Sequence, residues 1–204
     1  CLILHLGMSG SLRIITGNQP PQKHDHLDIE FESGLRLRFR DPRRFGCVLW
    51  TAQDPMQHKL LVRLGLEPLG DAFDGAYLHR KSRGRTQAIK TFIMDSHIVV
   101  GVGNIYASEA LFRSGVRPQR RAGLVSRQEY DRLAQSMQAV LREAIAAGGT
   151  TLRDYVSGEG KPGYFAFELN VYDQVGEPCP QCGHPIKRSC IGQRSAYFCA
   201  KCQR

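Results

Sequence analysis

Residues 179–202 read CPQCGHPIKRSCIGQRSAYFCAKC, in which two Cys-x-x-Cys pairs are separated by sixteen residues. Four thiolates at this spacing are typical of a tetrahedral Zn²⁺ site without an open coordination position. A segment of about 35 residues is also too small to fold on an apolar core alone, so a metal ion takes the place of that core. The sequence therefore predicts one structural zinc ion per chain, with a redox-active cysteine pair as the alternative. The predicted ligands are Cys179, Cys182, Cys199 and Cys202.

Three other features of the sequence are suited to phosphate binding. Alternation between the cysteine pairs predicts a hairpin that projects Arg194, a side chain type that recognises phosphate, although a merely solvated arginine fits equally well. The turn Gly101–Asn104 precedes a predicted helix, whose N-terminal N–H groups could bind a phosphate; a plain turn is the alternative. The basic run His79–Lys90 could follow a nucleic-acid backbone or form a solvated helix face.

The charge of the chain points to a polyanionic partner. The 204 residues contain 28 Lys and Arg against 19 Asp and Glu, a formal net charge of +9. A surplus of this size most often indicates nucleic acid. No uncharged apolar stretch approaches the roughly 18 residues that span a bilayer, so a membrane protein is not expected. Four of the seven cysteines have metal-binding spacing, which favours a reducing cytoplasm over a disulfide framework.

The N-terminal fifty residues have the alternation of β-structure. Apolar positions in 29–31 and 35–39 flank the turn Ser33-Gly34, which predicts a hairpin whose outer face pairs glutamates with arginines. A further strand is expected over Phe45–Trp50.

Helical periodicity begins after the Gly- and Pro-containing stretch 64–70. A capping box at Ser126–Glu129 opens the last of these helices, which is expected to end at Gly148. The other predicted helices are Asp74–Lys81, Thr86–Met94 and Ile105–Arg113. Alternation over Tyr164–Tyr172 predicts a strand before the finger.

Six motifs follow one another along the chain. They are His5–Gly10, Lys23–His26, Asp41–Gly46, Val100–Tyr106, Gly160–Phe165 and Cys199–Gln203. Together they resemble the motifs of bacterial formamidopyrimidine-DNA glycosylases, which repair 8-oxoguanine. The resemblance extends over the whole chain. The related endonuclease VIII proteins share the turn and the finger but are less similar around Met8 and Arg43.

This resemblance implies an α+β multidomain protein. The expected parts are a partial β-sandwich over residues 1–66, a helix–two-turn–helix DNA-binding domain over 67–158, and a region over 159–204 that contains a lesion-capping loop and a C-terminal four-cysteine zinc finger. The finger proper is expected at about 170–204.

The resemblance also implies a partner, double-stranded DNA with oxidised purines or abasic sites. The implied DNA-binding residues are His24, Arg43, Arg85, Lys90, Gly103, Asn104 and Arg194. Met8, Arg43 and Phe45 would fill the space left by the extruded nucleotide, a role that suits two apolar side chains and one hydrogen-bond donor. The lesion loop would contain Gly160, Lys161, Pro162, Gly163 and Tyr164.

The family combines N-glycosylase and AP lyase chemistry, the latter by β,δ-elimination. An N-terminal proline forms a Schiff base with the sugar C1′, assisted by a glutamate and a lysine, and none of the three has a counterpart here, where position 1 is Cys1. Among the residues present, the resemblance assigns a catalytic role only to Arg194, as proton donor in the δ-elimination. Stabilisation of the leaving phosphate is the alternative, because arginine is a poor general acid.

The length typical of the family implies that roughly the first quarter of a family member is absent from these 204 residues. We therefore expect a bifunctional enzyme for a full-length parent and little or no activity for residues 1–204 alone. The alternative is a non-enzymatic, zinc-dependent module that recognises damaged or distorted DNA. The expected setting is a monomer in the bacterial cytoplasm, associated with the nucleoid through DNA and not with a membrane.

Overall fold

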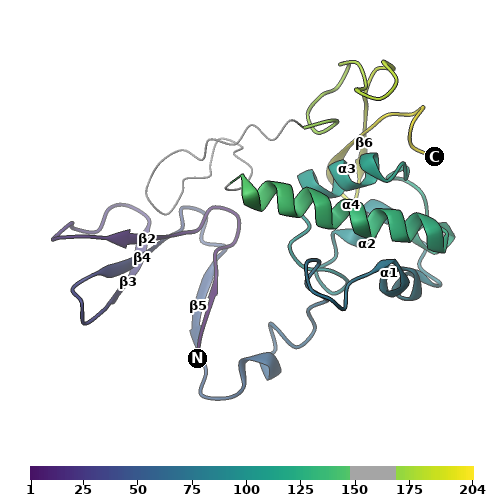
Figure 1. Cartoon of the computed structure of the whole chain (residues 1–204). Coiled ribbons are helices and arrows are strands. Elements are labelled where there is room, and N and C mark those ends of the chain that lie inside the picture. The colour runs from purple at the N-terminus through teal and green to yellow at the C-terminus, as the bar shows by residue number, and fades with distance from the viewer. Residues whose placement is uncertain (148–168) are drawn as a thin grey trace. The chain divides into compact units, whose positions relative to one another are not determined.

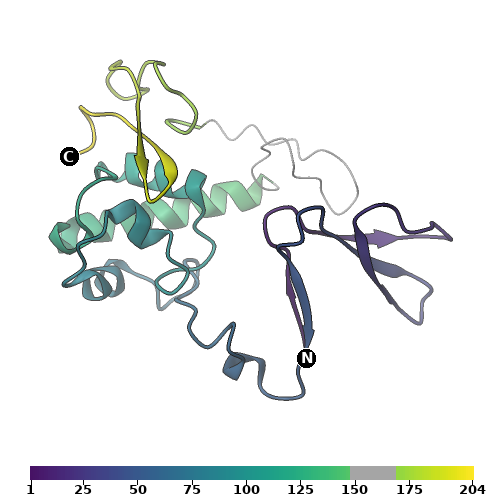
Figure 2. The same cartoon turned by 180° about the vertical axis from the view of Figure 1, so that it is seen from behind.

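The computed structural model describes residues 1–147 and 169–204. The chain divides into two compact units, which are described separately (Figures 1 and 2). The first unit contains Cys1–Val62, and the second contains Arg63–Ala146 and the C-terminal residues from 169 to 204.

Two small antiparallel sheets form the first unit. Strand β1 (Leu2–His5) pairs with β5 (Cys47–Trp50), and the second sheet has the order β2-β4-β3. These three strands are β2 (Ser11–Ile15), β3 (Asp25–Glu30) and β4 (Arg36–Arg40). A single 3₁₀ turn, η1 (Pro55–Gln57), follows. The mixture of these sheets with helices and a cysteine cluster confirms the predicted fold class.

The predicted hairpin is present as β3 and β4. Ile29 lies opposite Leu37 and Leu27 opposite Phe39, so the apolar positions share one face as the alternation requires. Gly34 takes a positive φ of 78° in the connecting turn, a conformation that glycine adopts without steric cost. The strand expected over Phe45–Trp50 begins two residues later, at Cys47.

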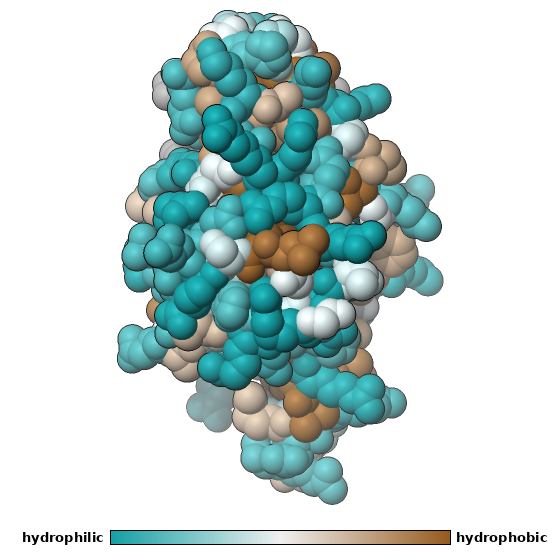
Figure 3. Space-filling model, turned by 90° about the vertical axis from the view of Figure 1, so that its right-hand side faces the viewer, coloured by the Kyte–Doolittle hydropathy of each residue, from teal (hydrophilic) through white to brown (hydrophobic). Residues whose placement is uncertain are grey.

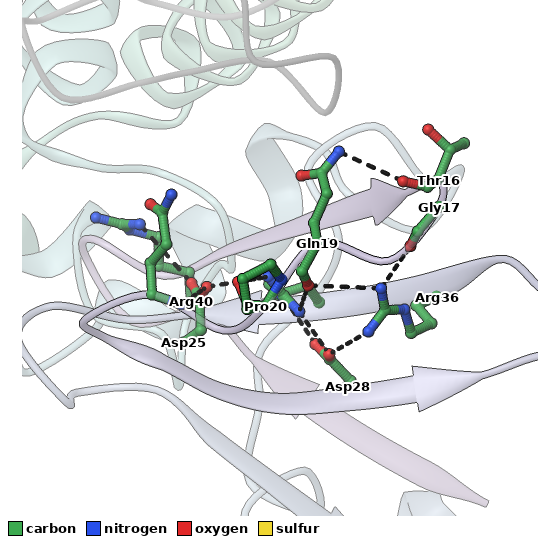
Figure 4. A network of polar contacts seen from close by, with 10 residues as sticks. Thr16, Gly17, Gln19, Pro20, Asp25, Asp28, Arg36 and Arg40 are labelled. Carbon is green, nitrogen blue, oxygen red and sulfur yellow. Dashed lines mark hydrogen bonds and ion pairs between the residues drawn. The ribbon is translucent and has the colours of Figure 1, made fainter.

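The polar face of this sheet is held by ion pairs to aspartates, not to the glutamates that the alternation suggested (Figure 4). Arg38 is 5% exposed and donates to both carboxylate oxygens of Asp28, at 2.8 and 2.7 Å. Asp28 lies directly opposite Arg38 in the strand register, which explains the choice of partner. The hydrogen bond from Arg38 holds the pKa of Asp28 below its ordinary value.

In its described part, the second unit contains four α-helices. They are α1 (Gly75–Ser82), α2 (Ile89–Ile93), α3 (Asn104–Arg113) and α4 (Arg127–Ala146), with the 3₁₀ turn η2 (Ala122–Leu124) before α4. The capping box is confirmed, because Ser126 Oγ accepts from Glu129 N and Glu129 Oε2 accepts from Ser126 N. Asp74 caps α1 by accepting from Tyr77 N at 2.7 Å. These caps satisfy N–H groups that have no partner within the helix.

Helix α2 is shorter than the predicted Thr86–Met94. The carbonyl of Gln87 accepts from Ala122 N at 2.9 Å, and Ala88 forms a β-bridge with Arg121. Because this pairing holds Ala88 extended, with ψ of 142°, the helix can begin only at Ile89.

A continuous apolar core joins the four helices. Its central side chains are fully buried, and they include Leu78, Phe92, Leu111, Tyr130 and Leu133. The Tyr130 hydroxyl donates to the Ala122 carbonyl at 2.9 Å, and burial raises the pKa of Tyr130 to about 12. In the second unit, therefore, the helices and η2 pack around one core.

The finger contributes a hairpin of β6 (Lys187–Ile191) and β7 (Arg194–Phe198). The strand predicted over Tyr164–Tyr172 is wrong for its described part, since residues 169–172 form no strand. There the N–H groups of Asn170, Val171 and Tyr172 all bind the Glu109 carboxylate. Three consecutive N–H groups cannot converge on one carboxylate in a strand, where they alternate in direction.

Hydrophilic side chains cover most of the face shown in Figure 3, with hydrophobic ones in small separate groups. Within residues 1–147 and 169–204, no helix is both long and apolar enough to cross a bilayer.

Candidate metal centre and nucleic-acid interface

The four predicted zinc ligands lie together. Their Sγ atoms are all within 4.8 Å of one another, with 3.9 Å between Cys179 and Cys202 and 3.6 Å between Cys182 and Cys199. A tetrahedral ion with Zn–S bonds of about 2.3 Å separates its ligands by about 3.8 Å. The donor set and its dimensions therefore fit a structural Zn²⁺, and they do not fit a single redox-active pair.

Backbone hydrogen bonds shape both ends of this centre. In the first knuckle, Gly183 N donates to the Cys179 carbonyl at 2.8 Å, and Gly183 has a positive φ of 70°. In the second knuckle, the buried Gln203 accepts from Cys199 N and donates to the Val116 carbonyl, both at 2.9 Å. Gln203 thus ties a cysteine loop to the segment that follows α3.

The predicted phosphate-binding turn lies at the N-terminus of α3. Gly103 is the N-cap, Gly101 has a positive φ of 75°, and a Cβ on either glycine would meet nothing within 4 Å. The buried Oδ1 of Asn104 has no hydrogen-bond partner among the described residues. The space beside the two glycines is therefore open, and the first N–H groups of a helix have no acceptor within the helix, which is the arrangement that suits an anion.

Lys90 and Arg194 lie at the junction of α2 and the finger hairpin. Both line a cavity of about 260 Å³, together with residues of α2 and the hairpin turn. Lys90 is 1% exposed, and its Nζ donates to the Ser195 carbonyl at 2.5 Å. Burial, with the adjacent Arg194, lowers the pKa of Lys90 to about 8. Lys90 is thus buried and hydrogen-bonded to the backbone of the hairpin, whereas Arg194 is exposed at the hairpin tip.

Two other residues predicted to contact DNA, Arg85 and His24, each accept a hydrogen bond at the backbone carbonyl. Arg85 is exposed, and its carbonyl accepts from Gly123 N at 3.0 Å. His24 is half-buried with a positive φ of 77°, and its carbonyl accepts from Asp41 N at 3.0 Å. Their contacts with DNA, like that of Lys90, stay predictions.

The three predicted void-filling residues are exposed on two turns of the first unit. Met8 and Phe45 are 64% and 57% exposed, as are other large apolar side chains of this unit such as Met56 at 64%, so what distinguishes them is their position on these turns. The guanidinium of Arg43 lies 4.7 Å from the centre of the Phe45 ring, a cation–π arrangement. Met8 belongs to a turn closed by the hydrogen bond from Gly10 N to the Leu6 carbonyl.

These two turns contact each other through their backbones. A Cβ on Gly7 would lie 2.7 Å from the Phe45 carbonyl carbon, and one on Gly46 would lie 2.5 Å from the His5 carbonyl oxygen. Both distances are too short for any other residue, so glycines are required for this approach. The turn carrying Met8 is therefore held close to the turn carrying Arg43 and Phe45.

Sequence reasoning missed three buried polar residues of these sites: Asp41, Glu109 and Gln203. The only signal for Glu109 was a charge inside an otherwise small and apolar helical stretch, Ala107–Leu111. Asp41 and Gln203 stand at one end of the motifs Asp41–Gly46 and Cys199–Gln203, but the sequence gave neither of them a role of its own. The lesion-loop prediction, Gly160–Tyr164, lies outside the described residues.

Three family models match successive parts of the chain. The formamidopyrimidine-DNA glycosylase N-terminal domain matches residues 1–48, and the H2TH domain of the same glycosylase matches residues 64–156. A zinc finger found in FPG and IleRS matches residues 176–204.

Individual relatives are similar over the whole chain. The formamidopyrimidine-DNA glycosylases of Syntrophotalea carbinolica and Methylococcus capsulatus are 58% and 57% identical, each over 100% of this chain and 75% of the relative. The crystal structure of the Thermus thermophilus MutM (FPG) protein is 38% identical with a TM-score of 0.87, over 99% of this chain and 75% of that one. Lactococcus lactis Fpg, in complex with DNA containing an abasic site, is 33% identical with a TM-score of 0.88, over 100% of this chain and 74% of that one. This chain belongs to the formamidopyrimidine-DNA glycosylase family.

Proposed function

We propose that this chain recognises oxidised purines and abasic sites in duplex DNA as part of base-excision repair. The observation that carries the proposal is the exposure of Met8, Phe45 and Arg43 on two turns that contact each other. Large apolar side chains held in water on a rigid framework are suited to a partner that buries them.

The chemistry of these three side chains matches the space left by a flipped nucleotide. Extruding a nucleotide costs a few kcal/mol of lost stacking and pairing, and least at a damaged or absent base. Met8 and Phe45 would restore apolar contact with the neighbouring bases, as wedge residues do in other DNA-binding proteins. Arg43 would donate hydrogen bonds to the base left without a partner.

Phosphate contacts account for affinity in this proposal. The open N-terminus of α3, with Gly103 and Asn104, would bind one phosphate, and the exposed Arg194 would bind another. His24 and Arg85 would add contacts along the backbone. The net charge of +9 supports binding that weakens as salt is added.

The four cysteines would hold one Zn²⁺ per chain. With all four coordination positions filled by thiolates, the ion would act in folding and not as a Lewis acid. Its role would be to fix the hairpin that carries Arg194.

The reaction that the family performs is N-glycosylase followed by AP lyase. Of the residues that the resemblance connects with that chemistry, this chain contains Arg194. We assign it to stabilising the phosphate that leaves in the δ-elimination, since a guanidinium holds its proton too strongly to be an efficient acid. A purely non-enzymatic module is not favoured, because the similar proteins are named as glycosylases. We place this activity on DNA in the cytoplasm, with the chain acting as a monomer.

The test compares Phe45→Ala and Met8→Ala with controls of matched exposure. Phe31 is 50% exposed and Met56 is 64% exposed, so Phe31→Ala and Met56→Ala remove similar surface elsewhere in the unit. We expect the first pair of variants to weaken binding to an abasic-site duplex by about tenfold, with little effect on undamaged duplex. Equal losses on both duplexes, or equal losses in the controls, would contradict the proposal.

A further inference from the structure

We propose that Asp41 and Ser9 are positioning residues that fix the two void-filling turns relative to each other, so that Met8, Arg43 and Phe45 enter DNA as one preformed unit. This inference rests on the function proposed above and identifies the residues that make it possible. Neither residue needs to touch DNA.

The Asp41 carboxylate joins the two turns directly. Asp41 is 1% exposed, and its Oδ1 accepts from the Ser9 hydroxyl at 2.8 Å. Its Oδ2 accepts from Gly46 N at 2.7 Å, and Oδ1 also accepts from Arg43 N at 3.3 Å. The Asp41 carboxylate therefore binds Ser9, the residue after Met8. It also binds the N–H groups of Arg43 and Gly46, which lie on either side of Phe45.

Ser9 adds a second connection between the same turns. Its Oγ donates to Asp41 and accepts from Arg43 N at 3.3 Å. A hydroxyl can donate one hydrogen bond while it accepts another, so Ser9 makes both of these hydrogen bonds at the same time. Because Ser9 follows Met8 in the chain, its position constrains the turn that carries the Met8 side chain.

The backbone of Asp41 is itself fixed to the neighbouring strand region. Asp41 N donates to the His24 carbonyl at 3.0 Å, and the Asp41 carbonyl accepts from His26 Nε2 at 2.9 Å. The carboxylate thus projects from a backbone that is held at both its N–H and its carbonyl. A rigid origin is what a positioning residue requires.

The backbones at Gly46 and Gly10 approach their neighbours so closely that no residue larger than glycine fits at either position. A Cβ on Gly46 would lie 3.1 Å from Asp41 Oδ2 as well as against the His5 carbonyl, and a Cβ on Gly10 would lie 2.1 Å from the Leu6 carbonyl oxygen.

The hydrogen bonds from Gly46 N and Ser9 also hold the pKa of Asp41 below its ordinary value, so the carboxylate stays ionised near neutral pH and both of its oxygens act as acceptors.

Preorganisation explains why such a connection is useful. Each side chain or turn that must be ordered during binding reduces affinity, and fixing it beforehand removes that cost. Met8, Arg43 and Phe45 are exposed, and strand pairing that places His5 opposite Cys47 and Ser11 opposite Arg40 fixes only the ends of their turns. Between those ends, the side chains of Ser9 and Asp41 supply the hydrogen bonds that join one turn to the other. Loosening the Asp41 network would therefore weaken lesion recognition more than general DNA binding.

The experiment measures the ratio of the Kd for undamaged duplex to the Kd for abasic-site duplex, together with the Tm. We expect Ser9→Ala to lower this ratio by about three- to tenfold, because the two turns lose the connections that Ser9 makes, and to lower the Tm by no more than a few degrees. Ser9→Thr keeps the hydroxyl and should restore the ratio. Ser33→Ala, in the exposed β3–β4 turn, is the matched control and should leave it unchanged.

Asp41→Asn tests the carboxylate. Its amide would place N–H groups against either Gly46 N or Arg43 N, and we expect a larger loss of the ratio than in Ser9→Ala. If Asp41→Asn does not fold, the Kd ratios of Ser9→Ala and Ser9→Thr still test the positioning role.

A spectroscopic readout separates positioning from general destabilisation. With 2-aminopurine opposite the abasic site, the change in fluorescence on binding that Phe45→Ala removes should also diminish in Ser9→Ala and return in Ser9→Thr. If Phe45→Ala lowers the ratio while Ser9→Ala and Asp41→Asn leave both readouts unchanged, the positioning role is overturned and the proposed function stands. If Phe45→Ala itself leaves the ratio unchanged, the proposed function fails, and this inference fails with it.

Discussion

Lys90 has an unusual environment for a lysine, because its ammonium is removed from water beside another cation. Its Nζ donates to the Ser195 carbonyl, the residue after Arg194, and Arg194 lies close enough to lower the Lys90 pKa further. Desolvation of a charge is unfavourable, and one carbonyl offsets it only in part. The position of the Arg194 hairpin is therefore maintained at a cost to stability.

That cost predicts a pH dependence. The Lys90 pKa is about 8 in the folded chain and near 10.5 when unfolded, so between these values the unfolded chain binds more protons and stability rises with pH. We expect the unfolding free energy of the wild type, relative to Lys90→Met, to increase by about 1–2 kcal/mol from about pH 8 to about pH 9.5. Urea denaturation at each pH measures it. The exposed Lys187→Met should show no such trend, and a flat difference for Lys90→Met would refute the interpretation.

Arg194 carries a prediction of its own. If it contacts a phosphate, Arg194→Ala should weaken duplex binding by about tenfold or more and reduce the slope of log K against log salt by about 0.9. Arg188, exposed on the adjacent strand β6, provides the control variant Arg188→Ala. Titrations at several salt concentrations measure both quantities, and an unchanged slope would place Arg194 away from the DNA backbone.

At the scale of elements, α3 connects the proposed phosphate-binding turn with the finger. Asn104 begins the helix, Glu109 lies in its middle, and Phe112 near its end packs with Val171 and Cys199 of the finger. The Glu109 carboxylate accepts four hydrogen bonds, from Val171 N and Tyr172 N and from two groups of Asn170. Helix α3 thus connects the two features of the second unit that are proposed to bind phosphate.

Replacing the Glu109 carboxylate with an amide should therefore lower the unfolding free energy. In Glu109→Gln, an amide NH₂ would face backbone N–H groups, and we expect a loss of about 2–3 kcal/mol in the unfolding free energy. Glu143→Gln is the control, since Glu143 pairs with Arg113 near the surface and such pairs contribute about 0–1 kcal/mol. Chemical denaturation measures both; equal effects would mean that the four hydrogen bonds add nothing beyond a surface ion pair.

Elements with strong local patterns were predictable from the sequence, and those fixed by distant partners were not. The capping box of α4, the Asp74 cap and the β3–β4 hairpin follow from residues close in the chain. By contrast, the late start of α2 depends on Ala122 pairing with Gln87, and the missing strand at 169–172 depends on Glu109. The cysteine ligands were predictable from spacing, whereas a single buried carboxylate such as Asp41 has no spacing to recognise.

At the scale of the whole molecule, the zinc centre should determine whether the second unit keeps its form. Elemental analysis should find one zinc per chain. Cys199→Ser should lose the metal and lower the Tm, because removing a ligand leaves the small finger without its core. Cys190→Ser is the matched control, as Cys190 is exposed and lies outside the four-cysteine cluster. Full metal content and an unchanged Tm in Cys199→Ser would disprove the ligand assignment.

In the proposed function, the exposed residues of the first unit and the proposed phosphate-binding features of the second together serve the recognition of damaged duplex DNA. Neither feature alone accounts for it. Charge would supply affinity for any duplex, and the proposed void-filling side chains would supply the preference for a lesion.

The most direct test is a fluorescence anisotropy titration of the zinc-loaded chain, residues 1–204, with two duplexes that differ only by an abasic-site analogue. We expect the abasic duplex to bind at least about tenfold more tightly, because the cost of opening the stack is smaller there. Phe45→Ala should remove most of that preference. Equal Kd values for the two duplexes in the wild type would contradict the proposed recognition of damaged DNA.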